Sequence, residues 1–304
     1  MNNAYDAYPM ISLESFRAEL ENRLCAELNV TTRILKSSPV GGGCINHCYK
    51  IETIAGDFFL KYNFAEKYPG MFAAEARGLE LLRSASALRI PEVILQFESG
   101  KFSFLVLEFL GNGKRRENFW KEFGSGLAKI HRQSAAKFGL DHDNYIGSLV
   151  QSNRMHDRWS TFCNEERLQA QLTLAVNHQR ISEKSVRSCE KIFSRLEELI
   201  PVESPALLHG DLWNGNFLNG PSGEACLLDP AVYFGHREMD LAMSRLFGGF
   251  DPEFYEAYQG VFPLQPGSDE RIPLMQLYPL LVHVNLFGGS YVQQVEEILK
   301  KFME

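Results

Sequence analysis

The stretch LLHGDLWNGNFLNGPSGEACLLD, residues 207–229, places a polar loop between two short apolar runs. In this loop a carboxylate, Asp211, stands five residues before an amide, Asn216, and a second carboxylate, Asp229, follows Asn216 by thirteen residues. Carboxylate and amide oxygens are hard donors of the kind that Mg²⁺ prefers. Each of these residues alone is an ordinary turn or strand-end residue. Together, at these spacings, they predict one catalytic and metal-binding loop.

The same order of residues is found in enzymes that transfer a phosphoryl group from ATP: a catalytic aspartate, a metal-binding asparagine and a metal-binding aspartate. In that reaction positioning and charge neutralisation matter more than covalent chemistry. We therefore interpret Asp211 as the catalytic base and Asn216 and Asp229 as magnesium ligands, with ATP as the phosphoryl donor.

A lysine and a glutamate upstream fit the same chemistry. Lys61 ends the apolar run FFLK, where protein kinases carry the lysine that holds the α and β phosphates. Glu75 lies in a segment with helical periodicity, residues 69–84. We predict an ion pair between Lys61 and Glu75 that directs the ammonium group towards the phosphates.

Two further segments are predicted to contact the nucleotide. Gly41, Gly42 and Gly43 would let the backbone approach a phosphate closely and offer N–H donors. They match neither G-x-x-x-x-G-K-[ST] nor G-x-G-x-x-G, so a flexible hairpin turn is the alternative. Backbone groups of Glu108 and Leu110 are predicted, from their position alone, to bond the adenine edge.

The chain as a whole predicts an α+β fold with two lobes. Residues 1–110 should form an N-lobe with a five-stranded antiparallel sheet and one helix, and residues 111–304 a mainly helical C-lobe. Helical periodicity covers residues 119–138, 159–177 and 182–199 and resumes at residue 238. Only ten residues separate Asp229 from Asp240, which is too short for a regulatory activation segment and favours a small or exposed acceptor. Asp240 is expected to tie the following helix to the catalytic loop.

Composition narrows the class of protein. A net charge of −7 argues against a nucleic-acid binder. The apolar run at residues 273–289 is too short and too polar to span a membrane. Six cysteines without a CxxC pair, and no signal peptide at the N-terminus, predict reduced thiols in a cytoplasmic protein. The oligomeric state stays open, as does the redox role of Cys44.

At this point the chain resembles the fructosamine kinase (ketosamine kinase) family, within the aminoglycoside-phosphotransferase-like kinases. The resemblance covers about residues 40–250. It rests on GGGCIN (41–46), LKYN (60–63), MFAAEARGLELL (71–82), NYIG (144–147), WSTFCNEERLQAQL (159–172), HGDLWNGN (209–216) and DPAVYFGHREMDLAMSRLFGGF (229–250).

The resemblance implies ATP-dependent phosphorylation of the sugar part of a ketosamine, typically at the 3-hydroxyl, and so a role in protein deglycation. It assigns Asp211 as the base, Asn216 and Asp229 as metal ligands and Lys61 as the phosphate anchor. Trp213 forms either an apolar wall for the sugar ring or a wedge that packs the loop, and His209 is a tentative substrate residue. One departure is Cys163, where a second aromatic residue is expected after Phe162.

Two alternatives remain. The acceptor could be another small amino alcohol, such as an aminoglycoside or a choline-like molecule. Less favoured is a non-catalytic nucleotide-binding scaffold, since Lys61, Asp211, Asn216 and Asp229 are all present. The sequence leaves open which ketosamine is used and whether it is free or attached to protein.

Overall fold

The computed structural model describes residues 13–41 and 45–303, and these residues form two compact units. The first unit contains the described residues up to Lys67 together with Glu92–Phe109. The second contains Tyr68–Pro91 and the described residues from Leu110 onward. The division into lobes after residue 110 stays a prediction. Helix α2 (Met71–Ser84), which that division places in the N-lobe, lies in the second unit.

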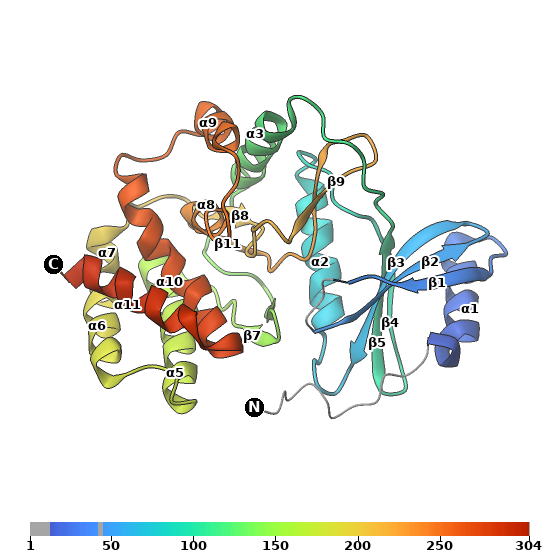
Figure 1. Cartoon of the computed structure of the whole chain (residues 1–304), viewed down its shortest axis with the longest axis horizontal. Coiled ribbons are helices and arrows are strands. Elements are labelled where there is room, and N and C mark those ends of the chain that lie inside the picture. Colours follow the sequence, from blue (N-terminus) through green and yellow to red (C-terminus); the bar gives the residue numbers. More distant parts are fainter. Residues whose placement is uncertain (1–12, 42–44, 304) are drawn as a thin grey trace. The chain divides into compact units, whose positions relative to one another are not determined.

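The first unit is built on an antiparallel sheet of five strands in the order β1-β2-β3-β5-β4 (Figure 1). The strands are β1 (Ile34–Pro39), β2 (His47–Thr53), β3 (Gly56–Phe64), β4 (Val93–Ser99) and β5 (Phe102–Glu108). Helix α1 (Arg17–Leu28), preceded by the short helix η1 (Leu13–Phe16), buries Leu20 and Leu24 in the same core as the sheet residues Phe58 and Phe104. The predicted five-stranded antiparallel sheet is confirmed.

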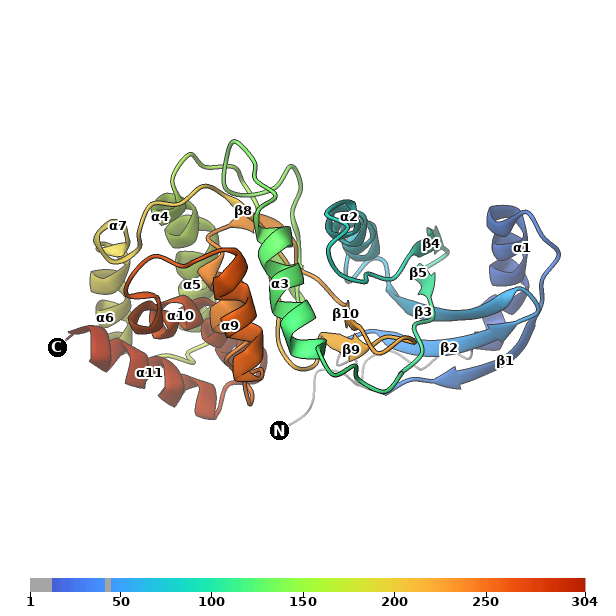
Figure 2. The same ribbon diagram turned by 90° about the horizontal axis from the view of Figure 1, so that it is seen from above.

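The second unit is mainly helical and has one large apolar core. Besides α2 its helices are α3 (Phe119–His131), α4 (Trp159–Phe162), η2 (Cys163–Gln169), α5 (Ala170–Asn177), α6 (Glu183–Phe193), α7 (Leu196–Leu199), α8 (Glu238–Met243), α9 (Pro252–Val261), α10 (Ser268–Phe287) and α11 (Ser290–Met303). Figure 2 shows α10 and α11 beside α5 and α6, and these four helices bury their apolar faces together. Among the described helices, none combines the length and hydropathy needed to cross a membrane.

Three short antiparallel pairs of strands hold the loops of the second unit. β8 (Ala206–Leu208) pairs with β11 (Tyr233–Gly235), and β9 (Phe217–Asn219) with β10 (Ala225–Leu227). β6 (Asn144–Ile146) pairs with β7 (Leu149–Gln151). The first two pairs frame the stretch quoted above, so both ends of that stretch are fixed by backbone hydrogen bonds.

Three predicted helices differ from the structure. The helix expected at residues 119–138 ends at His131, because Gln133 then accepts a hydrogen bond from Leu207 N and the chain turns along β8. The helix expected at 159–177 contains a π-helical segment, Cys163–Gln169. The helix expected at 182–199 breaks into α6 and α7. Apolar periodicity does not report such local breaks.

Candidate active site

The catalytic loop begins where β8 ends and passes very close to the segment that follows Asp229. Gly210 has a φ of 82°, and a Cβ atom there would lie 2.0 Å from the Ala231 carbonyl oxygen. Only glycine satisfies both conditions. Ala231 N donates to His209 O at 2.9 Å and keeps the two segments in contact. The glycine in HGD is therefore required by packing, and it places Asp211 at the start of the loop.

Asp240, in α8, holds the catalytic loop through its backbone. Its carboxylate accepts hydrogen bonds from His209 N at 2.7 Å and Gly210 N at 2.9 Å, and it contacts His131 Nε2 at 3.1 Å. Burial raises the pKa of Asp240, but the hydrogen bond and charge of His131 outweigh this and hold the pKa below its usual value. The expected tie between Asp240 and the loop is therefore present, with the carboxylate ionised.

Asn216 lies directly beside Asp211. Its Nδ2 donates to both the backbone oxygen and the carboxylate Oδ2 of Asp211, each at 2.8 Å. The amide nitrogen is thus committed to Asp211, which leaves Oδ1 as the atom of Asn216 able to bind a cation. An amide oxygen beside a carboxylate fits Mg²⁺, which takes hard oxygen donors.

Asp229 follows β10 and is tied to the same loop through its neighbour Leu228. Leu228 N donates to Asn216 O, and Leu228 O accepts from His209 Nε2, both at 2.9 Å. Asp229 itself is exposed and has a φ of 51°, in the left-handed region that costs free energy for a residue with a side chain. The backbone thus brings Asp211, Asn216 and Asp229 to one place.

The electrostatics of Asp211 suit a general base. Burial raises the pKa of Asp211 to about 7; the hydrogen bond from Asn216 opposes this rise, and the charges of Asp229 and Asp240 add to it. A pKa close to the working pH lets a carboxylate accept a proton and release it again.

The residues predicted to hold the nucleotide are less defined by the structure. Lys61 is buried in the middle of the sheet, opposite Cys48 and Leu105. Glu75 lies on α2 in the other compact unit, so the Lys61–Glu75 ion pair stays a prediction. Gly41 is exposed, and a Cβ atom there would meet none of the described atoms within 4 Å.

The other four residues predicted to bind the nucleotide, Gly42, Gly43, Glu108 and Leu110, also remain predictions. Gly42 and Gly43 lie outside the described residues, as does Cys44. Glu108 ends β5, where its N–H donates to Glu92 O at 2.9 Å, and Leu110 is buried just beyond it. The backbone N–H of Glu108 is therefore used within the sheet, and adenine binding would depend on other backbone groups.

His209 and Trp213, the tentative substrate residues, both pack inside the second unit. His209 is fully buried, its Nε2–H donates to Leu228 O, and its Nδ1 accepts from Asp211 N at 3.3 Å. With this geometry His209 is expected to hold the loop instead of contacting a substrate. The Trp213 ring is half-buried, covers Gly215 and meets Phe247 edge-on at 5.7 Å, as expected of a packing wedge.

Two buried ion pairs explain the GHRE segment, whose role the sequence left open. Arg237 donates twice to Glu203, at 2.7 and 2.8 Å. Arg271 donates twice to Glu238, at 3.0 and 2.6 Å. These pairs fasten the N-terminal end of α8 to the surrounding chain.

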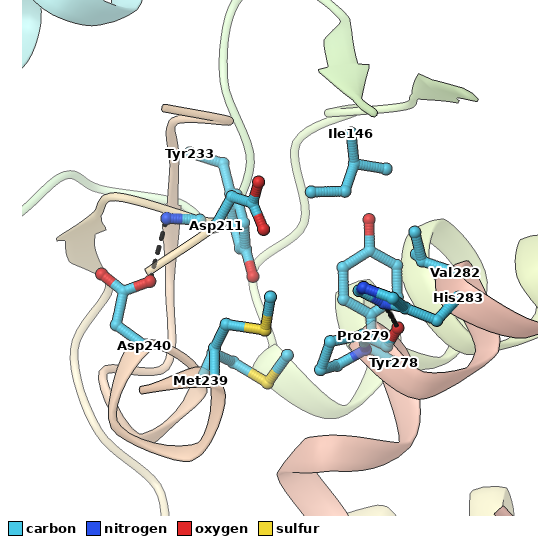
Figure 3. A pocket seen from close by; sticks show the side chains of 11 residues that line it. Ile146, Asp211, Tyr233, Met239, Asp240, Tyr278, Pro279, Val282 and His283 are labelled. Atoms are coloured by element: carbon cyan, nitrogen blue, oxygen red, sulfur yellow. Dashed lines mark hydrogen bonds between the residues drawn. The ribbon is translucent and has the colours of Figure 1, made fainter. Parts of the chain in front are cut away.

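A narrow cavity lies beside Asp211 (Figure 3). It measures about 330 Å³ including its opening to solvent, of which water-sized spheres enter only about 20 Å³. Besides Gly210, Asp211 and Asp240, its lining consists of Ile146, Tyr233, Met239, Met243, Tyr278, Pro279, Val282 and His283. A sugar therefore needs some of these side chains to rotate, and the flexible thioethers of Met239 and Met243 are suited to do so.

Sequence reasoning missed this lining because its members come from separate segments. Ile146 lies in the motif NYIG, and Tyr233, Met239 and Met243 lie in the motif of residues 229–250, but none of them was predicted to line a pocket. Tyr278 and His283 stand in α10, whose apolar sequence reads as core. For Trp159, Phe162 and Arg167 the sequence allows either a part in an acceptor pocket or helix packing, with packing favoured, and all three are buried in the second unit.

Comparison with known proteins agrees with this geometry. The chain matches the family model described as fructosamine kinase over residues 17–304. It is 41% identical over 272 residues to a probable ketoamine kinase of Enterococcus faecium, covering 88% of this chain and 95% of that protein. It is 37% identical over 281 residues to a chloroplastic protein-ribulosamine 3-kinase of Arabidopsis thaliana, covering 90% and 84%.

Solved structures show the same relationship. A putative fructosamine-3-kinase of Thermobifida fusca superposes with a TM-score of 0.84 at 33% identity, covering 93% of this chain and 98% of that one. A spectinomycin phosphotransferase, at 15% identity and a TM-score of 0.56, shares the fold alone. The expected α+β kinase-like fold and phosphotransferase class are confirmed. The chain belongs to the fructosamine kinase family.

Proposed function

We propose that this enzyme phosphorylates a sugar hydroxyl of a ketosamine, at the 3-position, with ATP as the donor. The observation that carries the proposal is the hydrogen-bonded loop that gathers Asp211, Asn216 and Asp229 beside the cavity. The names of the relatives supply the acceptor class, since they include ketoamine kinases and a protein-ribulosamine 3-kinase.

In this mechanism the chain's own groups orient the acceptor and manage one proton. The Asp211 carboxylate accepts a hydrogen bond from the attacking hydroxyl and takes its proton as the hydroxyl oxygen bonds to the γ-phosphorus of ATP and the bond from that phosphorus to ADP breaks. Asn216 Nδ2, which donates to the same carboxylate at 2.8 Å, fixes its rotamer. Asn216 Oδ1 and the Asp229 carboxylate would hold Mg²⁺. When bound, the cation neutralises charge on the transferred phosphate and leaving group.

The residues assigned to ATP keep the roles that the sequence predicts for them. Lys61 would contact the α and β phosphates, with Glu75 as its ion-pair partner. Gly41, Gly42 and Gly43 would cover the phosphates, and backbone groups at Glu108 and Leu110 would bond adenine. These roles rest on position within the kinase-like fold.

A 3-phosphoketosamine is unstable and eliminates, which frees the amine, so the proposed biological role is deglycation of proteins. The acceptor is then a small-molecule or protein-attached ketosamine, with neither nucleic acid nor membrane as a partner. A cytoplasmic location is proposed from the sequence, and Cys25, Cys163 and Cys189 are free thiols.

The test is ATP consumption measured with a panel of ribulosamines, erythrulosamines, fructosamines, aminoglycosides and choline. We expect magnesium-dependent turnover with the ketosamines alone, and release of free amine as their phosphorylated products decay. Asp211→Asn is the matched control for contaminating ATPases. Preferential turnover of choline or an aminoglycoside would refute the ketosamine assignment.

A further inference from the structure

The wall opposite Asp211 contains a tyrosine whose hydroxyl faces the cavity. Figure 3 shows the Asp211 carboxylate and the Tyr278 hydroxyl directed into the same space, with Ile146 beside them. Tyr278 stands on α10 and Ile146 on β6, so the cavity joins the catalytic loop to two remote segments. None of the proposed catalytic or metal-binding roles uses Tyr278.

A chain of hydrogen bonds fixes which way the Tyr278 hydroxyl points its proton. Asn144 Nδ2 donates to the Val232 carbonyl at 2.8 Å, so Asn144 Oδ1 is left to accept from Gln151 Nε2 at 2.7 Å. Gln151 Nε2 also donates to the Ala231 carbonyl at 3.2 Å. Because backbone carbonyls only accept, both amide orientations are determined.

The chain ends on the tyrosine. With its nitrogen committed, Gln151 offers Oε1, an acceptor only, and this atom lies 2.5 Å from the Tyr278 oxygen. Tyr278 must therefore donate its one proton to Gln151. Towards the cavity its oxygen presents lone pairs alone, as does the Asp211 carboxylate in the deprotonated form that acts as the base.

Two hydrogen-bond acceptors at one cavity fit a molecule that brings two hydrogen-bond donors. We infer that Tyr278 determines acceptor specificity by accepting a hydrogen bond from a second hydroxyl of the acceptor, close to the one that is phosphorylated. This inference rests on the proposed function and deepens it. A monoalcohol supplies one hydrogen-bond donor to Asp211 and leaves the lone pairs of the Tyr278 oxygen without a donor, whereas a polyhydroxylated sugar supplies a donor to each.

Contacts with Arg167 hold the tyrosines of this wall rigidly enough to discriminate between phosphoryl acceptors. The fully buried guanidinium of Arg167 lies 4.1 Å from the ring centre of Tyr233 and 5.5 Å from that of Tyr278. Arg167 in turn donates to Asn153 Oδ1 at 2.7 Å. Burial raises the pKa of Tyr278 to about 12, with Arg167 opposing and Asp211 adding to the rise, so the phenol keeps its proton at neutral pH.

The experiment compares a ketosamine that the enzyme turns over with a set of its monodeoxy analogues, each lacking one hydroxyl other than the one phosphorylated. For the unmodified enzyme we expect one analogue to lose about tenfold in kcat/KM, the effect of one neutral hydrogen bond. In Tyr278→Phe the parent should lose about the same factor, while that analogue should be unaffected by the substitution. The ratio of parent to analogue within one preparation does not depend on the fraction of folded enzyme.

Tyr255→Phe is the control, because it removes the same phenol hydroxyl from another tyrosine. Tyr255 is half-buried, contacts Ser244 Oγ at 3.2 Å and lies outside the cavity lining. It should keep the discrimination of the unmodified enzyme. If Tyr278→Phe slows the parent and every analogue by the same factor, or changes none of them, the inference is overturned. If the unmodified enzyme turns over no ketosamine, the proposed function fails instead.

Discussion

Asp240→Asn tests whether Asp240 positions the catalytic loop or only stabilises the fold. The carboxylate accepts hydrogen bonds from His209 N, Gly210 N and His131 Nε2. The side-chain oxygen of an asparagine can accept only some of these hydrogen bonds, and its NH₂ group faces another donor with which it cannot bond. Losing one hydrogen bond to a charged acceptor and stranding one buried N–H costs about 3 kcal/mol. In a unit of this size that corresponds to a fall of roughly 6–12 °C in Tm.

The effect on rate separates the two roles. Asp211 follows the two anchored backbone groups directly, and a misplacement of about 1 Å near the chemistry costs about 100-fold. Glu238→Gln is the matched control, since Glu238 is a buried carboxylate on the same helix that pairs with Arg271. Thermal denaturation and steady-state kinetics should show a lower Tm in both variants and a lower kcat in Asp240→Asn alone. Equal losses of kcat in the two variants would refute the positioning role.

The same variant predicts a dependence of stability on pH. The folded pKa of Asp240 lies below the unfolded value of about 4, so its contribution to stability is present above that pH and is lost as pH falls through the folded pKa. The difference in free energy of unfolding between the unmodified enzyme and Asp240→Asn should therefore shrink below about pH 4 in acid titrations.

Three further predictions concern the catalytic loop. Asp211→Asn should lower kcat by roughly 100- to 10,000-fold while ATP still binds. It should also remove the acidic limb of the pH profile of kcat/KM, which reports protonation of a carboxylate with a pKa of about 7. A rate near that of the unmodified enzyme excludes Asp211 as the base. Asp229→Ala should abolish magnesium-dependent turnover, and an unchanged metal titration would show that the ligand assignment is wrong. Gly210→Ala should lower both Tm and kcat, because its Cβ would lie 2.0 Å from Ala231 O; normal values of both would mean that the two segments separate at little cost.

The sequence predicted those parts of the site that lie within one local pattern. Asp211, Asn216 and Asp229 fall in a single loop whose ends are strand-like, so their spacing survives directly into the structure. The five strands likewise follow from short apolar runs between turns. Ile146, Tyr233 and Tyr278 were not predicted as a group, because they meet only after three segments fold together. The π-helical segment was not predicted either, because so local a change in the number of residues per turn is lost when apolar periodicity is judged over a longer window.

The contacts around Asp229 also explain why its short following segment matters. Leu228 makes backbone hydrogen bonds to Asn216 and to the His209 ring, and Ala231 makes one to His209. Strand β11 then pairs with β8. Much of the segment from Asp229 to α8 is thus anchored to the catalytic loop. A segment held in this way does not need phosphorylation to order it, because the hydrogen bonds that place Asp229 are already made. The free energy for positioning this segment therefore comes from folding itself, and activity should not require its phosphorylation.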